Sequence, residues 1–445
     1  MLENTVGIDF GTCFCRVAVV TGGQVDLLER IPSRVARKGY RFVAGDEALW
    51  YDKSYLSNAV ANISRLEVSL ETSVQVSRYD FSTMMLRHLK YCAERHWDSI
   101  DEVMVGVPYS FDFKRRNILK EAATSAGLNV RRLVNEPTAA AAAYKHLHQI
   151  KKETTLFVVM GGSSLDIAAI AIGKGVTVKA VASDLSMGGE DFTSVLVKYC
   201  LSKMAGEVGE AGKQTLWRLC ERAKKQLSSH QHVTIEATSF LPSVDLQIVL
   251  TRELMERLAV NLISRMEEAL VEVKTILTSH YLKVQKVVLE GGYTHMPWIL
   301  HLVERLFGQV ESFNVSSGYI AIGMAVLGAY PIQVVDLLPC RVELKTTPNF
   351  VYAEIPRYSI LPASIELEVE LFKKQQTVRF AAYDEAIHDP LASISIKHHS
   401  SDKTQTRTVT GSLSITNELE VSIRLVHPKK ETSQTIACPP LGKLS

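Results

Sequence analysis

The sequence of 445 residues has almost no excess of charge of either sign. Its 50 lysine and arginine residues stand against 48 aspartate and glutamate residues, which leaves a formal net charge of +2. A balance of this kind creates no broad electrostatic field that would attract nucleic acid or anionic lipid. We therefore expect neither a nucleic-acid partner nor a membrane partner.

Long apolar runs are missing as well, and we expect no leader segment. The chain contains no run of about 18 apolar residues, the length that could cross a bilayer. Residues 1–4 lead straight into an apolar, strand-like stretch, so the parts of a secretory signal find no room there. The sequence predicts a soluble, cytoplasmic protein.

Cysteine is scarce, and its spacing suits neither disulfides nor a metal. The seven cysteines are an odd number, they are scattered, and none stands in a C-x-x-C pair. Such a set is typical of free thiols in a reducing compartment.

Two kinds of periodicity divide the chain. Up to about residue 330, β-rich apolar stretches alternate with helical ones, which predicts an α/β unit. Beyond it, Ile365, Leu367, Val369 and Leu371 alternate with glutamates, the period of a strand with one wet face. We predict a domain at residues 1–331, a linker at residues 332–338 and a small antiparallel β domain at residues 339–445. Because the linker is apolar rather than rich in Gly and Ser, we expect it to be docked for part of the time.

Four glycine-containing turns are the candidate sites of chemistry. In the first turn, Asp9 ends an apolar strand and Gly11 and Thr12 follow it. Glycine lets backbone N–H groups approach a phosphate, a hydroxyl can bond to it, and a carboxylate can organise a hydrated cation. Taken alone, this pattern is also that of an ordinary hairpin turn.

The other three turns make a phosphate site the stronger interpretation. Residues 161–164 form a second strand-to-glycine turn about 150 residues later, which suggests two similar halves facing one nucleotide. Residues 188–189 and 291–292 are glycine pairs beside helical sequence, and helix N-termini are ready anion sites.

The segment from Asn135 to Tyr144, Asn-Glu-Pro-Thr followed by five alanines and tyrosine, makes the pattern specific. It resembles the signature helix of the seventy-kilodalton heat-shock (DnaK-type) chaperones, and residues 103–108, 127–130, 188–192 and 220–229 resemble other segments of that family in order. Actins and sugar kinases share the fold but lack this string. The resemblance implies an actin-like ATPase domain, with two similar lobes around a nucleotide cleft, followed by a small β-sandwich domain.

The resemblance also implies a site that binds ATP or ADP with Mg²⁺. Asp9 is expected to hold the magnesium shell, Thr12 to contact the γ-phosphate, and Glu136 to orient water and metal. The positions that cradle the phosphates or surround ribose and adenine are Gly11, Cys13, Gly161, Gly162, Ser164, Gly188, Gly189, Glu190, Glu221, Lys224, Lys225, Ser228, Gly291, Gly292 and Tyr293.

Departures from the family pattern weaken the expected hydrolysis. Ser64 stands where the family has a catalytic lysine, and the adjacent Arg65 points to another side of the backbone. Val159 replaces a second aspartate that helps to position the attacking water. Losing one preorganised charge-stabilising group commonly costs about 10² to 10³ in rate. We expect slow or absent hydrolysis.

The adenine side departs too. Lys225 replaces an arginine that stacks on the base, and lysine is not its equivalent. Tyr293 replaces a serine, and its ring could either stack on adenine or fill the place of adenine. Ser317 stands near a usual aspartate.

In the family the second domain clamps extended apolar peptides beneath a helical lid. No long amphipathic helix follows His427, so we expect no lid. The stripe from Ile365 to Leu371 fits a core face better than a peptide groove.

The leading hypothesis is a divergent ATP-binding chaperone. Its partners would be unfolded or extended polypeptide clients, J-domain proteins and nucleotide-exchange co-chaperones. The alternative is a catalytically inactive pseudo-ATPase that acts as a regulatory or partner-binding module. A carbohydrate kinase is a third option, although no catalytic aspartate for a sugar hydroxyl is evident.

Overall fold

The computed structural model describes most of the chain. The described residues are 5–38, 40–49, 55–57, 77–97, 100, 102–204, 207–241, 244–308, 311–314, 318–347, 350–371, 377–384, 391–397, 407–417, 419–427 and 430–436. Ser64, Arg65, Ser317 and Cys438 lie outside them.

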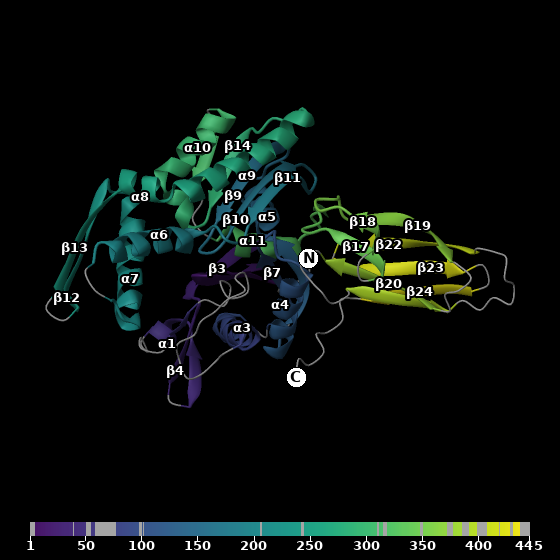
Figure 1. The fold of residues 1–445 in the computed structure, drawn as a ribbon, viewed down its shortest axis with the longest axis horizontal. Coiled ribbons are helices and arrows are strands. Elements are labelled where there is room, and N and C mark those ends of the chain that lie inside the picture. The colour runs from purple at the N-terminus through teal and green to yellow at the C-terminus, as the bar shows by residue number, and fades with distance from the viewer. Residues whose placement is uncertain are drawn as a thin grey trace.

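Two large sheets share one strand arrangement (Figure 1). In each sheet three consecutive strands pair antiparallel, and two later strands extend the sheet in parallel from the first of the three. The first sheet runs in the order β3 (Gln24–Pro32), β2 (Phe14–Thr21), β1 (Val6–Phe10), β7 (Glu102–Val107) and β8 (Asn129–Asn135). The second runs β11 (Val176–Asp184), β10 (Leu165–Ile172), β9 (Glu153–Met160), β14 (Lys286–Glu290) and β15 (Glu311–Asn314). The two similar halves expected from the sequence are therefore present.

Two helices cross between these sheets and bind them together. Helix α5 (Glu136–Leu147) follows the first sheet but packs on β9, β10 and β11, whereas α11 (Tyr319–Ala329) follows the second sheet and packs on β1, β2 and β7. The two helices also touch each other. Gly323 of α11 lies so close to Ala139 of α5 that a Cβ added at Gly323 would be 1.8 Å from the Ala139 carbonyl oxygen. This contact explains the small residues of the alanine run.

The remaining helices cover the outer faces of the two sheets. Helices α3 and α4 pack on each other beside the first sheet, α9 lies on β10 and β11, and α10 packs on α9. Helices α6 and α7 carry the hairpin of β12 and β13 to one side, at the far left of Figure 1. The bounds are α3 (Arg78–Glu94), α4 (Phe113–Ser125), α6 (Gly189–Ser202), α7 (Glu210–Leu227), α8 (Arg252–Leu258), α9 (Val260–Ser279), α10 (Pro297–Phe307), β12 (His232–Leu241) and β13 (Val244–Thr251).

A small three-stranded sheet with a short helix lies beside the first large sheet. Its elements are β4 (Arg34–Lys38), β5 (Arg41–Ala44), β6 (Tyr55–Ser57) and α1 (Asp46–Leu49). Side chains cap the helices on the same flank, since Ser77 accepts a hydrogen bond from the N–H of Asp80 and Asp112 accepts one from the N–H of Arg115.

The C-terminal part consists of two four-stranded antiparallel sheets. One contains β18 (Phe350–Ile355), β17 (Val342–Thr347), β20 (Thr377–Asp384) and β21 (Ala392–Lys397); the other contains β19 (Ala363–Leu371), β22 (Arg407–Ile415), β23 (Val421–His427) and β24 (Lys430–Ile436). Both sheets contribute to one hydrophobic cluster that includes Leu344, Leu367 and Leu413. Leu367 is buried while Glu366 and Glu368 are exposed, so this part of the predicted stripe is a core face.

The apolar connector is docked in this structure. Strand β16 (Val334–Val335) pairs with β11 and adds a sixth strand to the second sheet. The Asp336 carboxylate is buried and accepts hydrogen bonds from Tyr109 Oη at 2.6 Å, Asn135 Nδ2 at 3.0 Å and Thr138 Oγ1 at 2.9 Å. The connector is therefore held by Tyr109 after β7, by Asn135 at the end of β8 and by Thr138 on α5.

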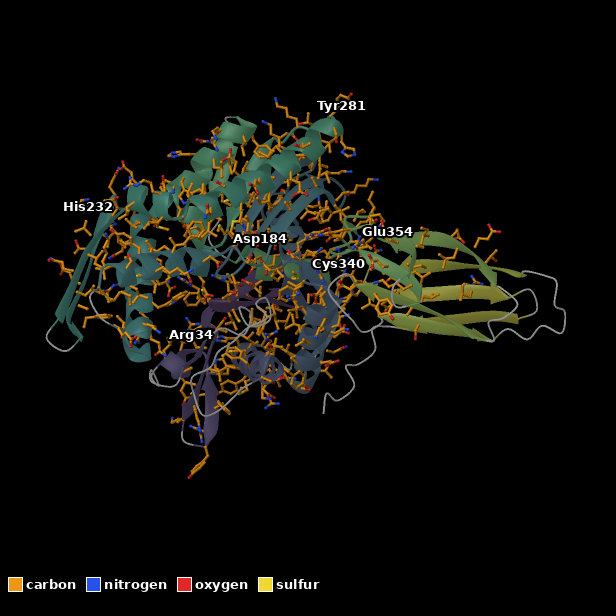
Figure 2. The ribbon with its side chains drawn as sticks, in the orientation of Figure 1. Arg34, Asp184, His232, Tyr281, Cys340 and Glu354 are labelled. Atoms are coloured by element: carbon orange, nitrogen blue, oxygen red, sulfur yellow. The ribbon has the colours of Figure 1, made fainter. Side chains whose placement is uncertain are left out.

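A second contact joins the C-terminal sheets to helix α4. Phe113 belongs to the hydrophobic cluster of those sheets, and its N–H donates to the Asp384 carboxylate at 3.2 Å. The thiol of Cys340 donates to the same carboxylate at 3.3 Å. Cys340 lies where the C-terminal sheets meet the rest of the chain (Figure 2).

Among the described residues, six of the seven cysteines are free thiols, as predicted. No helix in the described part of the chain combines the length and apolar character that membrane crossing needs.

Candidate nucleotide site

A cavity of about 370 Å³ opens between the two large sheets. A cavity of this size is within the range of small-molecule sites. Every site residue predicted from the sequence lines it except Gly188, although these residues are spread over some 280 positions of the chain. The cavity is also lined by residues that were not singled out from the sequence: Phe14, Arg16, Arg30, Pro108, Glu290, His295, Met296 and Ile320.

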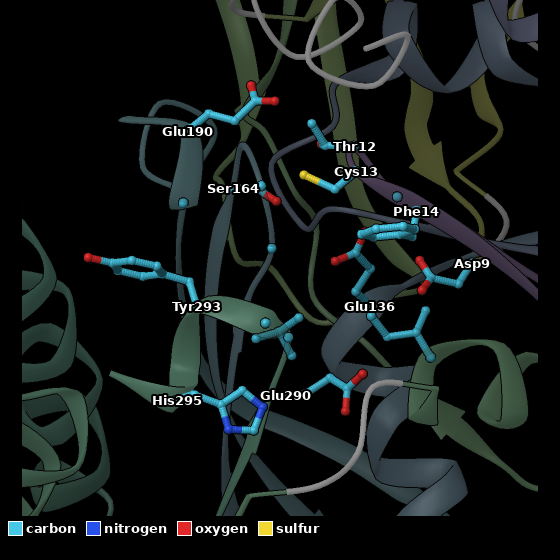
Figure 3. A pocket seen from close by; sticks show the side chains of 18 of the residues that line it. Asp9, Thr12, Cys13, Phe14, Glu136, Ser164, Glu190, Glu290, Tyr293 and His295 are labelled. Atoms are coloured by element: carbon cyan, nitrogen blue, oxygen red, sulfur yellow. The ribbon is translucent and has the colours of Figure 1, made fainter. Parts of the chain in front are cut away.

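The first two glycine turns meet at the top of the cavity in Figure 3. The hydroxyls of Thr12 and Ser163 lie 2.6 Å apart and are hydrogen-bonded. A Cβ added at Gly162 would come within 2.8 Å of the Cys13 sulfur, so the turns fit together only because position 162 carries no side chain. The halves of the molecule thus present their turns to one shared space.

The third glycine turn leads into helix α6, but its first amides are already hydrogen-bonded. The N–H groups of Gly189 and Glu190 donate to the carbonyls of Gly161 and Gly162 at 2.9 and 2.8 Å. The N–H of Gly188 donates to the Asp191 carboxylate at 2.8 Å, and a Cβ at Gly188 would lie 2.4 Å from the Gly162 oxygen. Gly188 therefore allows the two turns to pack closely, and its place in the phosphate cradle stays a prediction.

Lys224 reaches the cavity wall from helix α7. Its ammonium is buried and donates to the Gly189 carbonyl at 2.5 Å and to Thr193 Oγ1 at 2.8 Å. The same ammonium lies 5.5 Å from the ring centre of Tyr293. Burial lowers the pKa of Lys224, and its fixed partners hold α6 and α7 together beside the cavity.

Tyr293 stands on the opposite side of the cavity from Asp9 (Figure 3). Its ring is buried and packs on Phe192 with ring centres 4.4 Å apart, and on Trp298 at 6.4 Å. Gly291 precedes it with φ +99°, where a Cβ would lie 2.3 Å from the Met160 carbonyl oxygen. This turn therefore needs glycine, and the aromatic cluster behind it fixes the Tyr293 ring as part of the cavity wall.

Polar groups at the C-terminal end of helix α7 also line the cavity. Lys225 and Glu221 form an ion pair at 2.7 Å, and Ser228 Oγ donates to the Lys225 carbonyl at 2.7 Å. The Lys225 side chain is 59% exposed, so this pair contributes little to stability.

Buried carboxylates gather at the floor of the cavity. Asp9 ends β1, Glu136 opens α5 and Glu290 ends β14, and all three face the same space (Figure 3). Burial raises the pKa of Glu136 well above its ordinary value, and the negative charges of Asp166, Asp9 and Glu290 raise it further. Burial likewise raises the pKa of Glu290 to about 8, although the N–H of Gly318 donates to it at 3.1 Å.

Asp166 connects this floor to the docked linker. Burial raises the pKa of Asp166 to about 6, while hydrogen bonds from Ser183 and from the N–H of Tyr109 lower it. The hydroxyl of the same Tyr109 donates to Asp336. Tyr109 therefore touches both the connector and Asp166, a buried carboxylate whose charge acts on Glu136.

Arg16 forms an ion pair that the sequence interpretation missed. Its Nη1 lies 3.0 Å from the Asp9 Oδ2, and both side chains are buried. The two residues are directly opposite each other on the antiparallel strands β1 and β2, which places their side chains on one face. Burial raises the pKa of Asp9, and the charge and hydrogen bond of Arg16 lower it. An arginine inside an otherwise apolar strand is a signal that could have pointed to this pair.

Comparison with known proteins agrees with this geometry. The family description "Hsp70 protein" matches residues 51–386, which is well over half of the chain. The chain belongs to the Hsp70 family.

Two curated relatives show the extent of the similarity. Chaperone protein DnaK of Mycoplasmopsis agalactiae is 29% identical over 413 residues, which cover 84% of this chain and 68% of the relative. Chaperone protein DnaK of Ureaplasma parvum serovar 3 is 28% identical over 396 residues, which cover 81% of this chain and 65% of the relative. The chain thus spans about two thirds of the length of these relatives.

Members of the Hsp70 family bind ATP or ADP with magnesium, but the residues here do not fit the metal part of that pattern. The Asp9 carboxylate is already paired with Arg16, and Val159, which we expected to replace an aspartate of the family, lines the cavity without a carboxylate. Among the described residues no three His, Cys, Asp or Glu side chains are placed to hold a metal ion together. The geometry therefore does not support Asp9 as a magnesium residue.

Proposed function

We propose that this Hsp70 family member is an adenine-nucleotide-binding protein with a chaperone role and with slow or degenerate hydrolysis. The observation that carries the nucleotide proposal is the meeting of the Thr12 and Ser163 turns at the cavity between the two similar sheets. The chaperone role is supported by the family and by relatives that are themselves named chaperones. Residues 1–331 would hold the nucleotide, and residues 339–445 would meet extended polypeptide clients.

Slow hydrolysis follows from the chemistry of the cavity. Phosphoryl transfer is catalysed almost entirely by positioned charges and by a positioned water. Val159 offers neither, and its register partner on β14 is Glu290, whose raised pKa of about 8 keeps it protonated at neutral pH. The loss of a charged group at this position is expected to slow the reaction by about 10² to 10³.

A thermal-shift titration with a matched pair of glycine variants tests nucleotide binding. Gly161 lines the cavity and Gly173 lies at the other end of the same hairpin, and a Cβ at either position meets nothing within 4 Å. Both Gly161→Val and Gly173→Val should therefore fold normally. ATP and ADP should raise the Tm of the wild type and of Gly173→Val, since a ligand of the folded state stabilises it. Gly161→Val should lose that rise because its side chain enters the phosphate region.

The proposal fails if adenine nucleotides leave the Tm of the wild type unchanged at millimolar concentration. It also fails for this cavity if Gly161→Val keeps the full rise.

The second candidate function is a pseudo-ATPase that binds partners, and Val159 and the Arg16–Asp9 pair favour it. Single-turnover hydrolysis of bound ATP separates the two candidates, because a chaperone ATPase should show a slow rate that a J-domain protein stimulates. The double substitution Ser64→Lys with Val159→Asp should raise the rate of ATP hydrolysis about tenfold or more, because positioned charged groups contribute at least that much to catalysis. A pseudo-ATPase should show no turnover with or without the J-domain protein.

A further inference from the structure

We infer that Arg16 supplies the positive charge that a nucleotide meets at the floor of the cavity, so that ATP and ADP bind here without a divalent cation. This inference rests on the proposed nucleotide binding and concerns the same cavity.

The position of Arg16 is set by the sheet. It is the direct cross-strand partner of Asp9, and both residues line the cavity just beyond the first glycine turn. The Nη1–Oδ2 distance of 3.0 Å is that of a charge-assisted hydrogen bond. The Arg16 guanidinium is therefore held in a fixed position in the cavity wall.

The guanidinium has hydrogen-bonding capacity left for a ligand. Its side chain is 10% exposed, and among the described residues the guanidinium makes one hydrogen bond, which is to Asp9. An arginine carries five N–H donors in a planar fork that matches phosphate oxygens. One edge of the fork is used by Asp9, which leaves donors for the oxygens of a di- or triphosphate.

A magnesium ion would compete with this arrangement instead of completing it. Magnesium prefers carboxylate and water oxygens in a strict octahedral arrangement. Asp9 is engaged by Arg16, Val159 contributes no oxygen, and an ion beside Asp9 would also lie beside the guanidinium charge. The Arg16 guanidinium therefore occupies the place beside Asp9 that would otherwise attract a metal ion.

Glu290 does not restore the lost carboxylate in a form that suits a metal. It lies next to Val159 in the register of β14 and β9, but its side chain is 1% exposed and one oxygen accepts the N–H of Gly318. If Glu290 and Glu136 did hold an ion together, nucleotide binding would depend on that ion, and the experiment below would detect it.

Isothermal titration calorimetry of ATP and of ADP, in excess EDTA and in excess MgCl₂, tests the inference. For the wild type we expect the two conditions to give Kd values within about threefold of each other. Arg16→Lys keeps the charge but loses the planar fork, so in EDTA it should bind more weakly than the wild type and more tightly than the double variant described next. The double variant Asp9→Asn with Arg16→Gln leaves neither charge unpaired, and it should bind at least about tenfold more weakly than the wild type in EDTA.

Arg95 provides the matched control. It lies outside the cavity lining, and its guanidinium lies 6.0 Å over the ring centre of Tyr91 instead of on a carboxylate. Arg95→Gln should keep its binding in EDTA within about threefold of the wild type. An equal loss in Arg95→Gln would show that general positive charge, and not Arg16, is responsible.

Wild-type binding that requires Mg²⁺ and disappears in EDTA overturns this inference and leaves the proposed function standing. Absence of nucleotide binding in both conditions overturns the proposed function and this inference with it. Unchanged binding of the double variant in EDTA shows that the Arg16–Asp9 pair has no part in holding nucleotide.

Discussion

Glu290 illustrates how much a single buried carboxyl changes the chemistry of the cavity. Its side chain is almost completely buried, and one of its oxygens has no hydrogen-bond partner among the described residues. Burial raises its pKa from 4.5 to about 8. Because the folded state holds this proton more tightly than the unfolded chain, the stabilisation is complete below about pH 4.5 and is lost as the pH rises toward 8.

Glu290→Gln should therefore flatten the pH dependence of stability. The glutamine keeps an oxygen for the Gly318 N–H but cannot ionise, so the variant should gain stability over the wild type at pH 8.5 and show little difference at pH 5. The gain should be on the order of 2 to 4 kcal/mol. Urea unfolding at both pH values measures it. Glu272→Gln on the exposed face of α9 is the control, and an equal effect there would contradict the assignment to Glu290.

At the scale of elements, the contact between α5 and α11 determines where Glu136 lies. Glu136 is the first residue of α5, and the helix is held against α11 at Gly323 without any side chain between the two backbones. A Cβ added at Gly323 would lie 1.8 Å from the backbone oxygen of Ala139, and no side-chain rotation can relieve that clash. The two helices would have to separate, and Glu136 would move with them.

Gly323→Ala should destabilise the protein by about 2 kcal/mol, within the range of about 1 to 3 kcal/mol for overpacking, even though alanine favours helix. The free energy of unfolding from urea titration checks this. Gly292→Ala is the matched control because a Cβ there meets nothing within 4 Å, and its effect should stay within about 0.5 kcal/mol. A stable Gly323→Ala protein would mean that the helices have room to shift.

For the whole molecule, the buried Asp336 carboxylate keeps the connector against the first lobe. Two of the side chains that donate hydrogen bonds to it, Asn135 and Thr138, lie on either side of Glu136 at the start of α5. A third, Tyr109, also donates its backbone N–H to Asp166, whose charge acts on Glu136. The state of the connector and the geometry of the cavity are thus joined by short hydrogen-bonded paths.

Asp336→Asn should loosen the connector. The new amide would present donors to groups that also donate, so the variant should lose about 2 kcal/mol or more through unsatisfied buried groups. Limited proteolysis within residues 333–339 should become faster, and mass spectrometry of the fragments locates the cuts. Glu366→Gln on the exposed face of β19 should leave the cleavage rate unchanged. Equal resistance of Asp336→Asn and the wild type would show that the Asp336 hydrogen bonds do not hold the connector.

The sequence alone determined the features that depend on local pattern. Alternating periods predicted the α/β part and the later strands, and the spaced glycine turns predicted two halves that face one space, because only glycine permits the close approach seen at Gly162 and Gly291. The string from Asn135 to Tyr144 indicated the family.

Only the tertiary structure decided which side chains meet and which donors are already in use. Arg16 faces Asp9 because two strands pair in one register, Glu290 reaches the cavity floor because β14 lies beside β9, and the first amides of α6 bond to another turn. Such partners come from distant positions, and their charges act through the burial and distances that folding creates. A list of residue types contains neither quantity.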